Sequence, residues 1–113
     1  MMMKIETLGN MIDVVEKHWP FDETTYPELH SLSQEQKNLF TLKHILFHQI
    51  KAVAKLTEVC EVVDHGKSLD GDKLHVAVRN FFINTLRLTR AAGYEEDGLK
   101  TLVRLWVEEK HQP

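Results

Sequence analysis

The stretch that decides the fold reads Leu56-Thr57-Glu58-Val59-Cys60-Glu61-Val62-Val63-Asp64-His65-Gly66. Its acids, Glu58, Glu61 and Asp64, stand at three-residue steps, so a helix places their carboxylates along one side on successive turns. Carboxylates at this spacing repel one another unless they face water or a cation lies between them. Gly66 supplies a residue at which such a helix can end. The stretch therefore predicts the last turns of a helix with an acidic side.

The apolar residues on the N-terminal side of this stretch keep the same helical period. They form one stripe made of Leu39, Leu42, Leu46, Ile50, Val53, Leu56, Cys60 and Val63. Ser33 followed by Gln36 is a capping-box pattern, and Ser31 with Gln34 is a second candidate. We therefore expect one helix of about 30 residues, on the order of 45 Å long, that ends near His65.

Three further segments have helical periodicity. A first amphipathic helix is expected from about Lys4 to His18, because Pro20 disfavours helical angles in the residue before it. A third helix is expected after an N-cap at Asp70 or Asp72, and its stripe contains Leu74, Val78, Phe81, Phe82, Thr85, Leu88 and Ala92. A fourth follows Gly93, opens on acids that suit a helix N-terminus, and carries Leu99, Leu102, Val103 and Trp106.

These helices predict an all-α fold in a single domain, residues 1–113, because no segment has the two-residue period of a strand. Short connections between amphipathic helices favour a four-helix antiparallel bundle. The very short connection before the fourth helix predicts that helices three and four are antiparallel neighbours. The long second helix and the aromatic third helix leave apolar surface for a partner, so we expect a homodimer to complete the bundle.

Composition excludes several classes of protein. The net charge of −3 and the pI of about 6.1 come without any basic block, which argues against nucleic acid as a partner. No apolar run is long enough to span a membrane, and the first residues lack the apolar core of a signal peptide. A single cysteine, Cys60, suits a reducing compartment, and its apolar neighbours predict an inert thiol in the core. We therefore expect a cytoplasmic protein.

Two segments carry a resemblance to a known family. The segment from Leu56 to Asp64 resembles the Leu-x-Glu-x-x-Glu-Val-x-Glu signature of the MazG-like, all-α nucleoside triphosphate pyrophosphohydrolases. The segment from Val78 to Tyr94 is similar to that family's second signature helix, including the glycine that ends it. The resemblance covers most of the chain from about Thr41 onwards. It implies the MazG-like fold, a nucleoside triphosphate as ligand and Mg²⁺-dependent hydrolysis between the α and β phosphates.

The resemblance also assigns metal ligands, and here the chain departs from the family. Glu58 and Glu61 match the family's first acidic pair, whereas its second pair falls on Ala77 and Asn80. Alanine offers no ligand atom and asparagine only a neutral carbonyl oxygen, so Mg²⁺ binding is weakened. If a metal binds, we expect Glu58, Glu61, Asp64 and Asn80 to hold it. The competing interpretation is a solvated acidic face.

Four polar residues are candidates for contact with a nucleotide: Lys51, Lys55, Asn84 and Arg87. The lysines share a helix side with Glu58, and their pattern favours an ordinary mixed-charge surface over a phosphate contact. For Asn84 and Arg87 two interpretations stay open, namely ligand binding and a hydrogen-bond network in which Arg87 neutralises an acid in place of Mg²⁺.

Other motifs favour structural roles. The pair His44 and His48 has helical spacing but no third ligand at a zinc-like distance. Trp19, Phe21 and Tyr26 lie in a loop with two prolines, where packing is favoured over stacking on a nucleobase. Two functions follow from the sequence. One is a divergent nucleotide pyrophosphohydrolase with weakened Mg²⁺ binding and unassigned catalytic residues; the other is an inactive helical binding module on the same scaffold.

Overall fold

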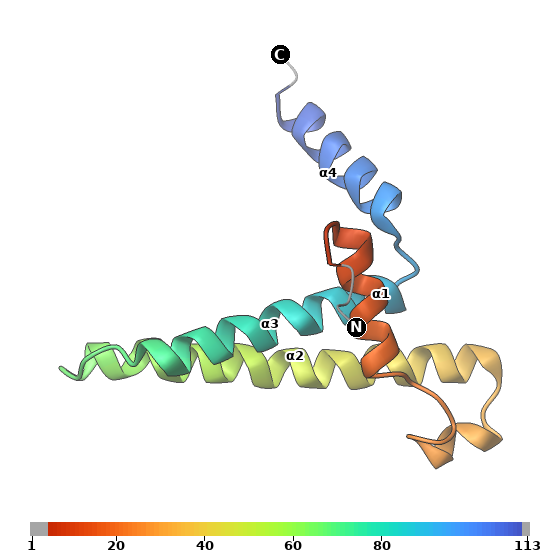
Figure 1. Ribbon diagram of the computed structural model, residues 1–113, viewed down its shortest axis with the longest axis horizontal. Coiled ribbons are helices and arrows are strands. Elements are labelled where there is room, and N and C mark those ends of the chain that lie inside the picture. Colours follow the sequence, from red (N-terminus) through yellow and green to blue (C-terminus); the bar gives the residue numbers. More distant parts are fainter. Residues whose placement is uncertain (1–4, 112–113) are drawn as a thin grey trace.

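The computed structural model describes residues 5–111, and these residues are almost entirely helical (Figure 1). Four α-helices and one short 3-10 helix follow one another as α1 (Leu8–His18), η1 (Pro27–Ser31), α2 (Gln34–Asp64), α3 (Gly71–Ala91) and α4 (Glu96–Lys110). No strand occurs among the described residues, so the all-α class is confirmed. Within residues 5–111, no helix combines the length and the apolarity that a membrane crossing needs.

Local capping sets the N-terminal end of each of the first three α-helices. The Thr7 hydroxyl accepts from the Asn10 N–H at 3.1 Å, which starts α1 at Leu8; Lys4 lies outside the described residues. Ser33 caps α2 by the predicted capping box, and the Asp70 carboxylate accepts a backbone N–H at 3.1 Å to start α3. A side-chain oxygen thus satisfies a backbone donor that the first turn of the helix leaves without a partner.

Two glycines end helices as the sequence predicts. Gly66 follows α2 with φ of +79°, and Gly93 follows α3 with φ of +88°. Both values lie in the left-handed region, which glycine enters without steric cost. Gly93 donates its N–H to the carbonyl oxygen of Arg90 at 2.9 Å, so the turn also satisfies a carbonyl at the end of α3.

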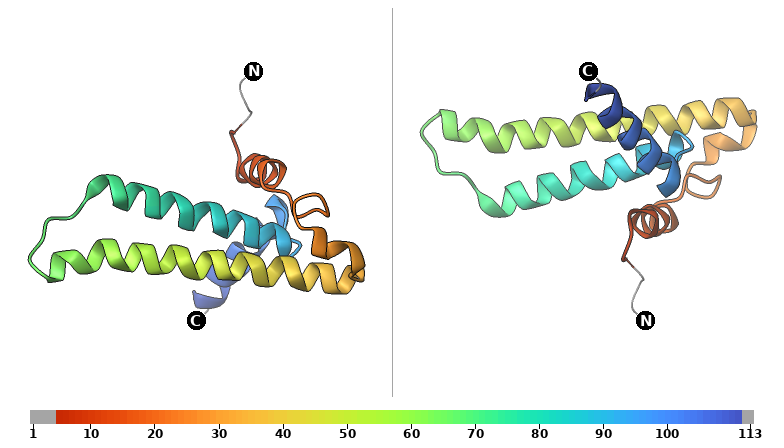
Figure 2. Two further views of the ribbon diagram at one scale, coloured as in Figure 1. Left: turned by 90° about the horizontal axis from the view of Figure 1, so that it is seen from below. Right: turned by 90° about the horizontal axis from the view of Figure 1, so that it is seen from above.

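The long helices α2 and α3 form an antiparallel hairpin, which the views from below and from above display along its whole length (Figure 2). Small buried residues, Ala52 on α2 and Ala77 on α3, lie inside the hairpin and allow the helices to approach closely. Near the C-terminal end of α3, Ile12 and Val15 of α1 pack against Leu86 to form the core. The molecule is therefore a helical hairpin with one helix packed across its end.

An ion-pair network also joins α1 to α3. Arg90 on α3 pairs with Asp13 and with Glu16 of α1, and its Nε lies 2.8 Å from the Glu16 carboxylate. The Arg90 side chain is largely covered, whereas both acids are exposed. The apolar core and this network hold α1, and with it the loop that follows α1, against the hairpin.

Helix α4 does not pack along α3 as an antiparallel neighbour, in contrast to the arrangement expected from the short connection. It leaves the end of α3 and projects away from the hairpin (Figure 1), and none of its residues is buried. The physical reason lies in α1, which covers the end of α3, with only Leu99 of α4 packed against the shared core. The bundle predicted from the sequence is therefore not closed within one chain.

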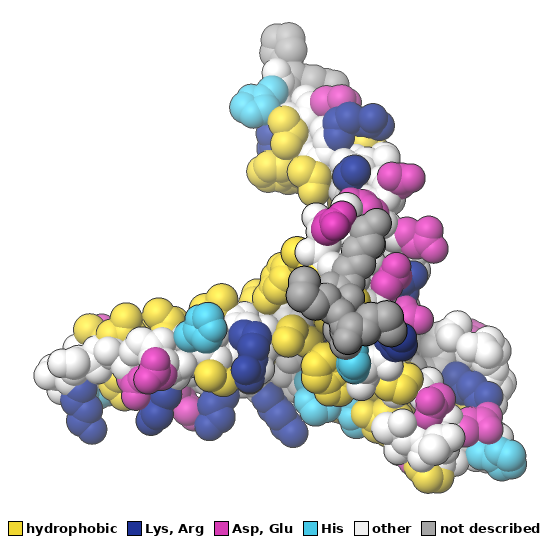
Figure 3. Space-filling view, viewed as in Figure 1, with side chains coloured by type: hydrophobic (Ala, Val, Ile, Leu, Met, Phe, Trp, Pro, Cys, Tyr) yellow, Lys and Arg dark blue, Asp and Glu magenta, His cyan; other side chains and the backbone are white. Residues whose placement is uncertain are grey.

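One side of the hairpin carries a stripe of exposed apolar residues, which we term the apolar face. It consists of Val53 and Cys60 on α2 and Val78, Phe81 and Phe82 on α3. Val53 is 45% exposed and Phe82 is 47% exposed. The space-filling view displays hydrophobic side chains along the upper edge of the hairpin (Figure 3). The prediction that Cys60 lies in the core is therefore wrong for the single chain, since its side of α2 has no covering element.

Candidate functional site

A pocket of about 780 Å³ opens between α2, α3 and the segment that follows α1. Helix α2 contributes Lys51 and Lys55 on successive turns, and α3 contributes Arg79 and Arg87. Its other lining residues include Trp19, Tyr26, His48, Asn80, Asn84 and Thr25. Among the described residues that line it, none is a carboxylate. We term this site the cationic pocket.

The cationic pocket lies on the side of the hairpin opposite to the apolar face. Helical register places Lys51 and Lys55 away from Val53 and Cys60, which border a different pocket together with Phe81. Lysine and arginine side chains accordingly follow the lower edge of the hairpin in the space-filling view (Figure 3). The chain as a whole carries a net charge of −3, so this gathering of cations is a local feature suited to an anion.

Arg87 is the most enclosed cation of the pocket. Its guanidinium lies over the Phe21 ring, with 4.8 Å between the guanidinium carbon and the ring centroid. Burial lowers the pKa of Arg87, and Tyr26 partly opposes that shift, so the group stays charged at neutral pH. Its Nε is buried and lacks a hydrogen-bond partner among the described residues. A half-buried guanidinium that lines the pocket is well placed to meet an anionic ligand.

His48 lies beside these cations on α2. Burial lowers the pKa of His48 most, and the neighbouring His44, Arg87 and Lys51 lower it further. Burial, and after it the positive surroundings, therefore favour the neutral imidazole. An anion in the pocket would reverse that preference, because negative charge stabilises the imidazolium.

The aromatic loop after α1 is packed, as predicted for two of its three rings. Phe21 and Tyr26 stack with 5.0 Å between centroids and 7° between planes. The Tyr26 hydroxyl lies 3.4 Å from Nε2 of His44, which explains His44 as a packed residue of this cluster. Trp19 differs, since it is 51% exposed and lines the cationic pocket. The loop thus builds one wall of the pocket and leaves one indole free at its edge.

The two asparagines of α3 form hydrogen bonds within their own helix. The Asn80 side-chain oxygen accepts from Arg79 at 3.2 Å, and the Asn84 amide donates to the Asn80 carbonyl oxygen at 2.9 Å. Within residues 5–111, Arg87 forms no ion pair with a carboxylate. Among the described residues these contacts thus form no inter-helix network around Arg87, and ligand binding by Asn84 and Arg87 stays a prediction.

The acids expected to hold Mg²⁺ are divided between two sides of the hairpin. Glu58 borders a pocket that it shares with Asn80, whereas Glu61 and Asp64 border the pocket that contains Phe81. Glu61 lies 3.6 Å from Nε2 of His65, and Glu58 lies 3.4 Å from Nζ of Lys55. In the described part of the chain, no three His, Cys, Asp or Glu residues are grouped to hold a metal ion. These residues do not fit one Mg²⁺ ion within a single chain, and the metal site stays a prediction.

The sequence assigns no role to Arg79, indicates His48 only as a possible metal ligand, and favours packing over nucleobase stacking for Trp19, yet all three line this pocket. A signal existed for the first, because Arg79 and Arg87 stand eight residues apart on a helix that also carries Asn80. A helix brings residues at such spacings toward one side over two turns. For Trp19 the aromatic loop suggests a pocket, but its exposure does not follow from the sequence because it depends on how α1 packs against α3.

Comparison of the chain with family models, with curated proteins and with solved structures gives no match. The assignment of function therefore depends on the geometry of the pocket. A concave site with convergent cations, amides and one exposed aromatic ring has the positive charge that suits an anionic ligand.

Proposed function

We propose that the chain binds the phosphate groups of a nucleoside triphosphate in the cationic pocket. One observation carries this proposal: four cations, Lys51, Lys55, Arg79 and Arg87, line the pocket without a carboxylate among its described lining residues. Its volume of about 780 Å³ lies within the range of about 300–1,000 Å³ that small-molecule sites occupy.

The residues have distinct parts in this proposal. Arg87 offers a planar fork of donors that suits two phosphate oxygens, and its packing on Phe21 holds that fork in place. Lys51 and Lys55 act as point charges on successive turns of α2. The exposed indole of Trp19 offers a surface for the nucleobase, because base stacking on an aromatic ring tolerates any base.

We further propose that the chain is a divergent MazG-like protein that functions in the cytoplasm. Two observations support the family assignment. The segments that resemble the family's signatures lie on α2 and α3, which pack side by side, and the pocket between them is cationic. Hydrolysis is implied by the resemblance alone. Glu58 and Glu61 border different pockets, so we propose no Mg²⁺-dependent reaction step for them.

Binding should strengthen as the pH falls, and calorimetry with inorganic triphosphate and with a panel of nucleoside triphosphates tests this. The surroundings lower the pKa of free His48, so binding of an anion raises that pKa and takes up a proton. Affinity therefore rises as the pH is lowered through the ordinary range of histidine, from about 7.5 to about 5.5. We expect a gain of up to about tenfold, since a charge-assisted contact contributes about 1.5 kcal/mol.

The matched control is His48→Gln, which keeps a polar side chain but cannot gain a charge in this range. Protonation of the phosphate itself weakens binding equally in both proteins, so the difference between the two profiles isolates His48. Equal profiles would remove His48 from the site. Absence of binding by the wild type at either pH would overturn the proposed function.

A carboxylate at Asn80 should create a response to Mg²⁺. Asn80 and Glu58 border the same pocket. Asn80→Asp therefore places a second carboxylate near Glu58, and a charged carboxylate binds Mg²⁺ more strongly than a neutral amide oxygen. We expect millimolar Mg²⁺ to raise the melting temperature of Asn80→Asp more than that of the wild type. Glu61 lies across the hairpin, so the same response in the Asn80→Asp, Glu61→Gln double variant would exclude Glu61 as a ligand.

The second candidate function is the inactive binding module, and the apolar face supports it. Val53, Val78 and Phe82 are about half exposed, which is unusual for large apolar side chains on adjacent helices. A wild type that binds no triphosphate with or without Mg²⁺, yet forms a stable complex through this face, would favour the module over the nucleotide-binding protein.

A further inference from the structure

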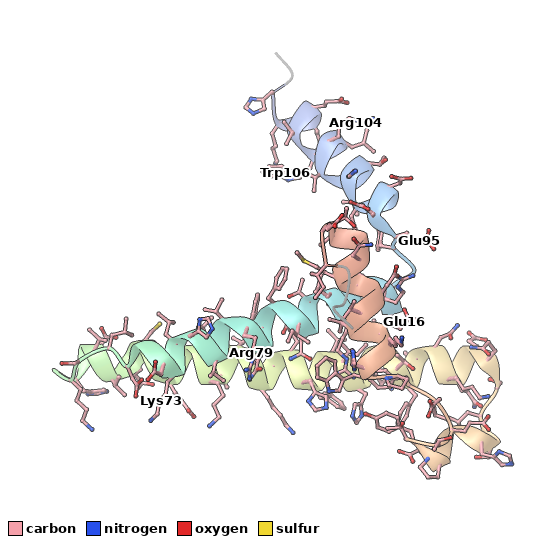
Figure 4. All side chains as sticks on the ribbon, in the orientation of Figure 1. Glu16, Lys73, Arg79, Glu95, Arg104 and Trp106 are labelled. Atoms are coloured by element: carbon pink, nitrogen blue, oxygen red, sulfur yellow. The ribbon has the colours of Figure 1, made fainter. Side chains whose placement is uncertain are left out.

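The apolar face continues onto α4, and together they line the inner side of an L-shaped molecule. Helix α4 rises from the same side of the hairpin on which the apolar face lies (Figures 1 and 3). On α4, Trp106 points toward this inner side and Arg104 points away from it (Figure 4). The exposed apolar residues of α4 include Leu102, Val103 and Trp106, the last of which is 58% exposed.

The chain exposes far more surface than a compact protein of its mass. Its accessible surface is 8863 Å², which is roughly 2,400 Å² more than the surface expected for a folded chain of 13.2 kDa. Its radius of gyration is 17.5 Å, whereas a compact domain of this length has a radius of about 13 Å. A stable interface buries about 800 Å² on each partner, so the excess is ample for a dimer.

We propose that two copies of this chain pair through the apolar face and α4, with α4 of each copy covering the apolar face of the other. A two-fold axis makes the interface self-complementary, so each copy must supply both halves of the contact. This chain does so. Its apolar face on α2 and α3 lacks a covering helix, and α4 carries exposed apolar residues that lack a surface to pack on. Pairing then completes between two chains the bundle that one chain leaves open.

The sequence pattern supports this occupant independently of the area. Val53, Cys60 and Phe81 belong to the stripes whose helical period predicts a core, yet the single chain leaves them exposed. Burial in a homodimer would account for residues that have the helical period of a core and yet are exposed in the single chain. The cationic pocket faces the opposite side of the hairpin, so pairing leaves it open and does not depend on the proposed function.

Sedimentation equilibrium of the full chain tests the proposal. Interfaces of this size have dissociation constants from micromolar to picomolar. At a protein concentration of about 50 µM we therefore expect the wild type to sediment at twice the chain mass of 13.2 kDa. Val53→Glu and Trp106→Glu each place a charge in the interface and should sediment as monomers. Trp106→Glu keeps the test valid if Val53→Glu fails to fold, because α4 has no residue buried within the chain.

Phe47→Glu is the matched control, since Phe47 is a 60% exposed aromatic residue that helical register turns away from Val53 and Cys60 of the apolar face. It should sediment as a dimer. Cys60 gives a second measurement, because a thiol reagent should react more than tenfold faster with Trp106→Glu than with the wild type. A monomeric wild type would overturn the proposal, as would dissociation of the Phe47→Glu variant to the same extent as Trp106→Glu.

Discussion

Replacement of Arg87 by glutamine should weaken triphosphate binding by about 10- to 100-fold, because a hydrogen bond to a charged group contributes about 1.5–3 kcal/mol. Arg87 is the half-buried cation of the pocket, and its Nε has no partner among the described residues. Loss of a partly desolvated cation costs more than loss of an exposed lysine, whose charge is screened by water. Isothermal titration with inorganic triphosphate measures the effect without any contribution from a nucleobase.

Arg104→Gln provides the control for Arg87→Gln. Arg104 lies on α4, points to solvent and lies 3.8 Å from Glu108, so its loss removes the same charge from outside the pocket. Arg87→Lys should give an intermediate affinity, since lysine keeps the charge but lacks the planar fork. If Arg87→Gln and Arg104→Gln bind triphosphate equally well, the cationic pocket is not the site.

Ile12→Ala should lower the free energy of unfolding by about 2–5 kcal/mol, the usual cost of truncating a fully buried isoleucine. Ile12 is 1% exposed and packs against Val15 and Leu86 in the small core that joins α1 to α3. For a domain of this size the change corresponds to a fall in melting temperature of about 8–20 °C. Since α1 holds the loop with Trp19 and Tyr26 in place, triphosphate affinity should fall as well.

Ile5→Ala is the control for this second prediction, because it makes the same chemical change at a residue that is 52% exposed. It should shift the melting temperature by no more than about 2 °C, as expected for surface substitutions that cost less than about 0.5 kcal/mol. Thermal unfolding followed by circular dichroism distinguishes the two variants. Equal shifts would mean that α1 is not anchored through Ile12.

The sequence predicts the helices well because the signals for them are local. Ser33, Asp70, Gly66 and Gly93 act on the residues beside them, so the ends of α2 and α3 follow from the sequence alone. The direction of α4 does not follow, because it depends on whether α1 or α4 covers the end of α3. Both helices present apolar residues to that end, and the periodic pattern does not rank them.

The candidate site is predictable only in part for the same reason. Helical spacing relates Lys51 to Lys55 and Asn84 to Arg87, and the structure brings all four of these predicted residues to one pocket. The carboxylates behave differently. Each three-residue step falls short of a full helical turn, so over two steps the side chains move around the helix axis and no longer share one side. Glu58 and Asp64 consequently border different pockets.

The cationic pocket and the apolar face lie on opposite sides of one hairpin, and this placement determines how many ligands a pair of chains can bind at once. In a two-fold pair the two pockets would open outward, away from the shared core and from each other. The sites would then fill independently, with one ligand per chain and no cooperativity between them. A surface that displays many triphosphate groups, such as a derivatised resin, would retain the pair by avidity far longer than it would retain a single chain.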